Sequence, residues 1–295
     1  RTYGSGKPMG KAADQLAKWK CPLRTICFGI SRDASQARDV AIDNIAARQA
    51  LRERERTEEE LRTAKTIMQR LLPPMAPKPP EGYANAAYHG ACLTIGGDFF
   101  HFFPRQDGYG MMLADVAGKG LSAALIVANF HAVWHHLLSS GSPEDQWLSI
   151  LNDELAGYLP ENRFITLAMA ICKPRAGELI FASAGHNPGL VVRGGVVEEL
   201  NPTGPVLGLM PGMSYRVSKI EFPAGSRILL NSDGVTDQFD PAGEEFGQQR
   251  LNDIVREGSS LAPQELQQRI ATSLDSHADG AAQVDDITVS ILDRL

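Results

Sequence analysis

The sequence has few cysteines, and none has the spacing of a structural metal site. None belongs to a CxxC pair; they stand at Cys21, Cys27, Cys92 and Cys172. Zinc ribbons and disulfide-stapled domains are therefore disfavoured. Free thiols are typical of a reducing compartment, so we predict a cytoplasmic protein.

Long apolar runs and an excess of positive charge are also lacking. No hydrophobic segment approaches the roughly 20 residues that span a bilayer, and no signal peptide opens the chain, so we expect no membrane insertion. The net charge of −6 argues against nucleic acid as the main partner, because such proteins present a basic face. With 43% hydrophobic residues, the 295-residue chain can bury a core. It begins at Arg1 rather than at methionine, and we expect it to be a fragment.

Glycine and proline are absent from Gln36 to Leu72, and this segment is rich in Ala, Arg, Glu, Gln and Leu. That composition predicts a helix, and we assign residues 36–74 to a helical signalling linker. Apolar residues recur at the spacing of a coiled coil at Leu61, Ala64, Met68 and Leu71. We therefore expect a homodimer through this helix. The alternative is a solvated helix that lies on the next domain.

The linker separates two regions of different texture. Residues 1–35 read as the remnant of a sensor domain, in which the apolar stretch Ile26–Ile30 is expected to form a buried strand. Residues Phe28–Asp33, which include the end of this expected strand and the residues after it, resemble the end of a PAS domain. Residues 75–295 form the expected main domain, in which short strands alternate with glycine turns.

Strands and helices of the main domain come in blocks, which favours an α+β fold with antiparallel sheets. The expected strands are Ala84–His89, Phe99–Phe103, Gly110–Asp115, Phe164–Ile171, Glu178–Ser183, Gly189–Arg193, Arg227–Asn231 and Ile287–Leu292. The expected helices are Ala123–Leu138, Pro143–Tyr158, Gln248–Glu257 and Ala262–His277.

Acidic residues recur at the ends of these strands. Asp98 leads into an aromatic strand, Asp115 and Asp233 end apolar strands, and Asp285 and Asp286 precede the last strand. Any one of them alone is better explained by a turn. Together they indicate carboxylates that converge, and hard divalent cations offset such a concentration of negative charge.

Six segments occur in an order that is similar to the SpoIIE/RsbU branch of the PPM metal-dependent serine/threonine phosphatases. They are GGDFFHFF (96–103), LADVAGKG (113–120), SAGHNP (183–188), SDGVTD (232–237), FGQQRL (246–251) and DDITV (285–289). The resemblance extends from about Leu71 to the last residue. It implies a four-layer α-β-β-α sandwich of two antiparallel sheets flanked by helices, preceded here by the long linker helix.

The resemblance also implies a centre of two Mn²⁺ or Mg²⁺ ions. Asp115 is expected to bridge both ions, and the carbonyl of Val116 to bind one of them. Asp98 is expected to bind one ion, and Asp233 and Asp285 the other.

Two further acidic residues are less firmly placed by the resemblance. Asp286 is a less favoured alternative to Asp285, and Asp237 is expected near a third, weakly held ion. The implied chemistry is hydrolysis of phosphoserine or phosphothreonine by a water that two metal ions activate. Asp98, Asp115 and Asp233 act through that water. The implied substrate is a phosphorylated anti-sigma-factor antagonist of the STAS type.

One position departs from the family pattern. His101 stands where related sequences usually carry an acidic residue, and this change could alter the surroundings of the metals. A catalytically silent scaffold that binds a signalling partner is therefore the alternative function. A nuclease that uses clustered aspartates is disfavoured by the acidic net charge.

Other short motifs are weaker. Residues 4–7 resemble a phosphate loop but lack its spacing. His131 and His135 have the i, i+4 spacing of a zinc site, but no glutamate follows His131, so a packed or exposed helix face is favoured. For His186 and Asn187 we expect local hydrogen bonds rather than catalysis.

Overall fold

The computed structural model describes residues 23–71, 76–93 and 95–295. The chain divides between Glu60 and Leu61 into two compact units. Helix α2 (Leu23–Leu71) contributes residues to both units. The second unit contains all the strands of the described residues and the aspartates singled out above.

Helix α2 corrects the prediction for the N-terminal region. The strand expected at Ile26–Ile30 is wrong, because these residues are helical. A lone strand leaves its backbone N–H and C=O groups unpaired, whereas a helix pairs them within the segment. The helix also continues through the boundary expected near residue 35. The phosphate-loop-like residues 4–7 and the rest of the expected sensor remnant up to residue 22 lie outside the described residues.

The second unit contains two five-stranded sheets in which all neighbouring strands are antiparallel. Sheet A has the order β1-β10-β9-β6-β7 and sheet B the order β2-β3-β4-β5-β8. The strands of sheet A are β1 (Tyr83–Gly90), β10 (Ile287–Arg294), β9 (Arg227–Asn231), β6 (Gly189–Arg193) and β7 (Val196–Leu200). Those of sheet B are β2 (Asp98–Arg105), β3 (Gly108–Val116), β4 (Ile165–Lys173), β5 (Glu178–Ala184) and β8 (Ser218–Glu221).

The eight expected strands and four expected helices are all present; Gly189–Arg193 and Arg227–Asn231 have the expected bounds, and the other elements have shifted ends. The helices of this unit are α3 (Leu121–Ser139), η1 (Glu144–Gln146), α4 (Trp147–Ala156), α5 (Asp233–Thr236), α6 (Gly247–Glu257) and α7 (Pro263–Ala278). The sequence did not predict β7, β8 or the short α5 as elements. Strands β7 and β8 lie at sheet edges and are largely exposed, so they lack an apolar stripe.

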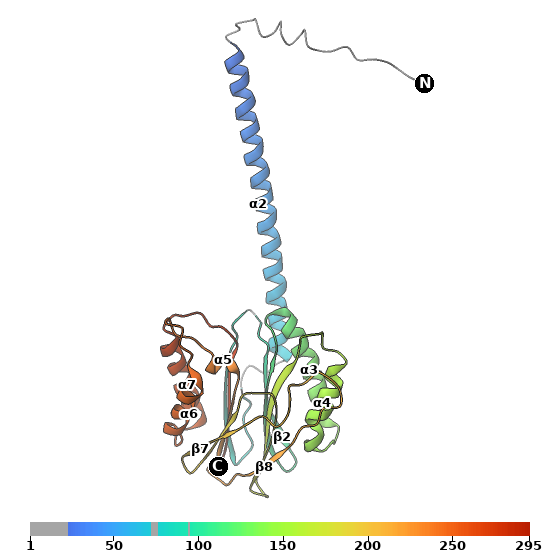
Figure 1. The fold of residues 1–295 in the computed structure, drawn as a ribbon, viewed down its shortest axis with the longest axis vertical. Coiled ribbons are helices and arrows are strands. Elements are labelled where there is room, and N and C mark those ends of the chain that lie inside the picture. The colour runs from blue at the N-terminus through green and yellow to red at the C-terminus, as the bar shows by residue number, and fades with distance from the viewer. Residues whose placement is uncertain (1–22, 72–75, 94) are drawn as a thin grey trace, which may run out of the picture. The chain divides into compact units, whose positions relative to one another are not determined.

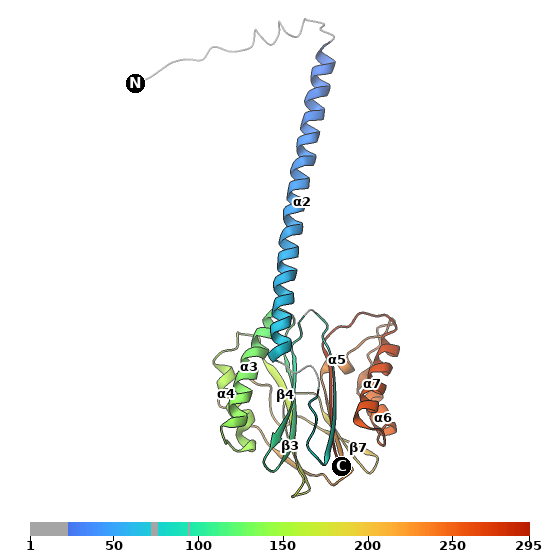
Figure 2. The same ribbon diagram turned by 180° about the vertical axis from the view of Figure 1, so that it is seen from behind.

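Three apolar cores hold the layers together, and they confirm the four-layer sandwich. The first, with Trp134 and Leu151, lies between helices α3 and α4 and sheet B. The second, with Phe100 and Leu230, lies between the two sheets. The third, with Ile270, joins sheet A to helices α6 and α7. The helix pairs flank the two sheets on opposite sides (Figure 1) (Figure 2).

Alternation along β2 and β3 places the two strand-end aspartates. Phe100 on β2 and Leu113 on β3 lie in the core between the sheets, whereas Phe99 lies in the core beneath α3. Because side chains alternate along a strand, Asp98 and Asp115 share the faces of Phe100 and Leu113. Both carboxylates therefore lie on the side of sheet B that faces sheet A.

The last turns of α2 bear on the coiled-coil prediction. Met68 is buried in the core beneath α3, and Ala64 packs against the same core. Helix α2 therefore uses at least part of its predicted dimer seam to contact the second unit's own core. Ala64 and Met68 therefore fit the alternative prediction, in which the helix lies on the next domain. Ile67 remains 55% exposed beside them.

Among the described residues, α3 is the one helix with the length and composition of a membrane span. It is 19 residues long, and an 18-residue window of it has a mean hydropathy of 1.3, so the sequence does contain one segment near the bilayer length. The apolar residues have another use here, because Val127, Phe130 and Trp134 are buried against sheet B.

Candidate metal centre

The aspartates of the strand ends meet at one end of the space between the sheets. Asp98 and Asp115 are directly paired across β2 and β3. Asp233 follows β9, and Asp285 precedes β10, the strand that pairs with β9. Thr288 on β10 donates its hydroxyl to Oδ2 of Asp98 at 2.5 Å, which joins the two sheets at this point.

The pKa values of these carboxyl groups show that their charges interact. Burial, and then the charge of Asp115, raises the pKa of Asp98 well above its usual value. Burial, followed by the charges of Asp233 and Asp285, raises the pKa of Asp115 to about 7. The pKa of Asp233 is raised by burial and then by Asp285. Such a set is stabilised by a bound cation.

Asp285 and Asp286 have different surroundings. The carboxylate of Asp286 is buried and accepts backbone N–H groups of Cys92 at 2.8 Å and Gly97 at 2.5 Å. Asp285 is more exposed; its Oδ1 accepts the N–H of Asp286 at 2.9 Å. Asp286 therefore fixes the loop before β2, which leaves Asp285 as the better candidate ligand.

Glycines allow these segments to approach one another closely. A Cβ atom on Gly96 would overlap the carboxylate of Asp286, and one on Gly234 would overlap the carbonyl oxygen of Asp286. A Cβ on Gly97 would lie 3.1 Å from the carbonyl oxygen of Val116. The Gly-Gly-Asp and Asp-Gly pairs thus serve close backbone approach at the site.

The loop after Asp115 is held by two cationic side chains. Lys119 forms an ion pair with Oδ2 of Asp285 at 2.9 Å. Arg163, just before β4, donates to the carbonyl of Ala117 at 2.5 Å. Its guanidinium fills the space where a Cβ of Gly118 would lie.

The SAGHNP turn makes hydrogen bonds, although to residues distant along the chain rather than the local ones expected. His186 is buried, and its Nδ1 lies 2.7 Å from the hydroxyl of Thr166, the residue that pairs with Asp115 across β3 and β4. Burial lowers the pKa of His186 to about 4. Asn187 donates to the hydroxyl of Thr236 at 3.5 Å.

Asp237 also lies close to the cluster. Its Oδ1 accepts the hydroxyl of Thr236 at 2.9 Å, and its charge contributes to the raised pKa of Asp233. Its side chain is exposed at the rim of the site.

His101 lies on the opposite face of β2 from Asp98. Its Nδ1 accepts the indole N–H of Trp134 at 3.0 Å, and its ring lies 5.0 Å from that of His135 on α3. The rings of His131 and His135 are 4.4 Å apart. His101, the residue that departs from the family pattern, therefore belongs to the packing between β2 and α3.

Within the described ranges, no three His, Cys, Asp or Glu side chains are arranged to hold a metal ion as they stand. The donor set nevertheless fits hard divalent cations, since Asp98, Asp115, Asp233 and Asp285 supply carboxylate oxygens whose charges repel one another.

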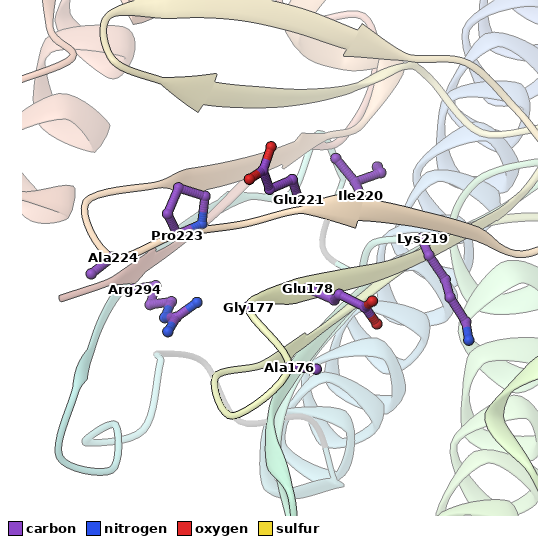
Figure 3. A pocket seen from close by; sticks show the side chains of 9 residues that line it. All are labelled: Ala176, Gly177, Glu178, Lys219, Ile220, Glu221, Pro223, Ala224 and Arg294. Carbon is purple, nitrogen blue, oxygen red and sulfur yellow. The ribbon is translucent and has the colours of Figure 1, made fainter.

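A separate open pocket of about 440 Å³ lies elsewhere on the unit. Glu178, Lys219, Glu221 and Arg294 project around it (Figure 3). Arg294 is the last residue of β10, whereas Asp285 and Asp286 directly precede the first residue of that strand. The pocket therefore lies away from the acidic cluster.

Comparison with known proteins identifies the family. The profile of Stage II sporulation protein E (SpoIIE) matches residues 105–295. The chain belongs to the SpoIIE family. Among curated relatives, Protein IcfG of Synechocystis sp. is 28% identical over 259 residues, which cover 78% of this chain and 40% of IcfG. Phosphoserine phosphatase RsbU of Bacillus subtilis is 28% identical over 237 residues, covering 80% of this chain and 70% of RsbU.

Solved structures show the same fold as this SpoIIE-family chain. The SiaA-PP2C domain of Pseudomonas aeruginosa has a TM-score of 0.72 at 21% identity, covering 82% of this chain and 98% of that domain. The catalytic domain of the serine/threonine phosphatase PstP, in complex with two manganese ions, has a TM-score of 0.52 at 18% identity. That likeness covers 72% of this chain and 97% of the PstP domain.

Three residues that support the candidate centre were not singled out from the sequence: Thr288, Lys119 and Arg163. Thr288 and Lys119 lie inside the recognised segments DDITV and LADVAGKG, and Arg163 directly precedes the expected strand Phe164–Ile171. A polar residue within such a motif was the available signal. Its partner could not be read from the sequence, because each contact joins segments distant along the chain.

Proposed function

We propose that this chain is a Mn²⁺- or Mg²⁺-dependent protein serine/threonine phosphatase. The observation that carries the proposal is the convergence of Asp98, Asp115, Asp233 and Asp285 at one end of the sandwich, where burial and the neighbouring carboxylate charges raise the pKa of Asp98, Asp115 and Asp233. Membership of the SpoIIE family and the name of RsbU, a phosphoserine phosphatase, support it.

In this proposal Asp115 would serve both metal ions. Asp98 and the carbonyl of Val116 would hold one of them, and Asp233 and Asp285 would hold the other. The ions would supply activation of a water for in-line attack on phosphorus and would offset charge on the phosphoryl oxygens. The two manganese ions of PstP, a protein of the same fold, support two sites.

The chain's own residues would position these ligands. Thr288 orients Asp98 through its hydroxyl hydrogen bond. Asp286 accepts the N–H of Gly97 and so fixes the backbone next to Asp98. Arg163 holds the carbonyl of Ala117 and with it the loop that presents Val116. These bonds preorganise the donors, which lowers the cost of binding a cation.

A phosphorylated protein is the substrate we propose, of the STAS-type anti-sigma-factor antagonist class by analogy with the family. Residues 36–74 would act as the signalling linker of a cytoplasmic homodimer, with a sensor remnant over 1–35 and the phosphatase over 75–295. Exposed apolar residues of α2, such as Ile45 and Leu51, support a partner for this helix. The chain spans 40% of the length of IcfG and 70% of the length of RsbU.

The test replaces Asp115 or Asp233 with alanine and measures hydrolysis of p-nitrophenyl phosphate and of a phosphoserine peptide with manganese. Loss of the metal ligand is expected to lower turnover by about a hundredfold or more. Asp275→Ala, at an exposed position on α7, is the matched control and should retain turnover. Unchanged turnover in Asp115→Ala would refute the proposal.

The silent-scaffold alternative rested on His101. This side chain binds Trp134 on the face of β2 away from Asp98, so it does not itself argue against metal binding. Calorimetric manganese titration, with and without a phosphorylated partner, separates the two functions. If the chain binds both manganese and the phosphorylated partner but releases no phosphate, the scaffold function is favoured.

A further inference from the structure

Lys119 lies at the candidate centre, beside Asp285. Its ammonium lies 2.9 Å from Oδ2 of Asp285 and also donates to the carbonyl of Val284. Among the described residues it is the only cation in an ion pair with any of the strand-end aspartates. Arg163, the other cation of this loop, binds the carbonyl of Ala117 instead.

Both carboxylate oxygens of Asp285 are already engaged. Oδ1 accepts the backbone N–H of Asp286 at 2.9 Å, and Oδ2 binds Lys119. A divalent cation that uses Asp285 must therefore displace one of these partners or share an oxygen with it. The N–H of Asp286 is fixed by the backbone beside a buried residue, whereas the side chain of Lys119 is 43% exposed. Lys119 is thus the partner that can leave.

The loop around Lys119 permits such a release. Gly118 and Gly120 flank it with φ angles of 108° and 73°, which are conformations that favour glycine. An exposed ion pair is weak in water, so the ammonium can move into solvent at little cost. Two positive charges cannot both approach Oδ2 closely without repulsion.

We propose that Lys119 is an internal counter-ion that competes with a divalent cation for Asp285. It lowers the metal affinity of the site and is released when the ion binds. The inference rests on the proposed metal centre, and it assigns Lys119 a role in the affinity of that centre rather than in the chemical step.

Calorimetric titration of the full chain with manganese, without substrate, tests the competition directly. Lys119→Met removes the ammonium and keeps the length of the side chain, and it is expected to bind manganese about two- to fivefold more tightly. Lys119→Arg retains the charge and should stay close to the wild type. Lys219→Met is the matched control on β8, where the exposed side chain belongs to the strand at the edge of sheet B.

The same substitution made in an Asp285→Asn variant separates competition at Asp285 from a general effect of removing a positive charge. In Asp285→Asn the competing carboxylate is gone, so adding Lys119→Met should give no further gain. A gain of equal size in both backgrounds would overturn the inference. So would Lys119→Met binding manganese no more tightly than the wild type. If the wild type binds no manganese at all, the proposed function is overturned as well. That result differs from one in which the wild type and Lys119→Met bind manganese with equal affinity, which overturns only the role of Lys119.

Discussion

The hydroxyl of Thr288 donates to the carboxylate of Asp98 at 2.5 Å, although the two residues are 190 positions apart in the chain. Asp98 begins β2 in sheet B, and Thr288 belongs to β10 in sheet A. Nδ1 of His89 lies 2.9 Å from the same hydroxyl. The orientation of a candidate metal ligand in one sheet is therefore set by a residue of the other.

Replacement of Thr288 by valine should weaken the centre. Valine keeps the shape but removes the donor, which leaves the buried carboxylate of Asp98 without this bond. We expect a loss of about 1–3 kcal/mol in the free energy of unfolding and at least about tenfold in manganese affinity. Urea unfolding and calorimetric titration measure the two effects. Thr288→Ser keeps the hydroxyl and should resemble the wild type; equal losses in both variants would contradict a role for the hydrogen bond.

Substitution of Gly234 by alanine should disturb the site through the backbone. The added methyl group would overlap the carbonyl oxygen of Asp286, which cannot move without shifting the start of β10. We expect about 1–3 kcal/mol of destabilisation and a loss of manganese-dependent turnover. Gly157→Ala is the control, since its nearest neighbour, the carbonyl oxygen of Glu154, is 3.8 Å away. Equal stability and turnover of the two variants would contradict the crowding at Gly234.

Acid should destabilise the packing between β2 and α3 through His101. Burial, and then the charges of His135 and His131, lowers the pKa of His101 from 6.5 to about 4. The unfolded chain therefore binds this proton at higher pH, so the stability from neutral His101 is complete above about pH 6.5 and is lost as the pH falls towards 4. At about 1.4 kcal/mol per pKa unit, the full loss is about 3 kcal/mol.

Substitution His101→Asn should remove that part of the acid sensitivity, because asparagine cannot titrate but can still accept the indole N–H of Trp134. Urea unfolding at about pH 7 and about pH 5 gives the comparison. His136→Asn, at an exposed position on α3, is the control. An unchanged pH dependence in His101→Asn would show that His101 is not responsible.

The end of α2 should be part of the folded second unit. Met68 is 9% exposed and packs in the core beneath α3, whereas its neighbour Ile67 is 55% exposed. Met68→Ala is expected to cost about 2–5 kcal/mol in unfolding free energy, and Ile67→Ala less than about 0.5 kcal/mol. Unfolding at several protein concentrations separates this effect from any dimer. Similar costs for both variants would contradict the packing of Met68.

The sequence was a good guide where an apolar run was bounded by glycines. Strands β2 and β3 carry aromatic and aliphatic residues on both faces, and glycines mark their ends, so their extent and the aspartates beside them could be predicted. Strands β7 and β8 are exposed at sheet edges, and nothing in their pattern separates them from loops. At Ile26–Ile30 an apolar run alone did not distinguish a strand from a helix.

The partners of the site residues were beyond such a prediction. Lys119 pairs with Asp285 only because the loop after β3 lies beside the segment before β10, and that contact depends on how the two sheets dock. For α2, the recurrence of Ala64 and Met68 indicated a buried seam but not which surface buries it. A heptad pattern is the same for a second copy and for the chain's own core.

The pairing of β1 with β10 has a consequence for the order of events during synthesis. Tyr83 is registered with Arg294 and Gly90 with Ile287, so β1 lacks its sheet neighbour until β10 has left the ribosome. Domains dominated by such distant pairings fold slowly, because a long loop must close first. The candidate centre obtains Asp285 from the same late segment. A nascent chain is therefore unable to assemble the complete set of candidate metal ligands, and the proposed activity would begin only after the whole sandwich has closed.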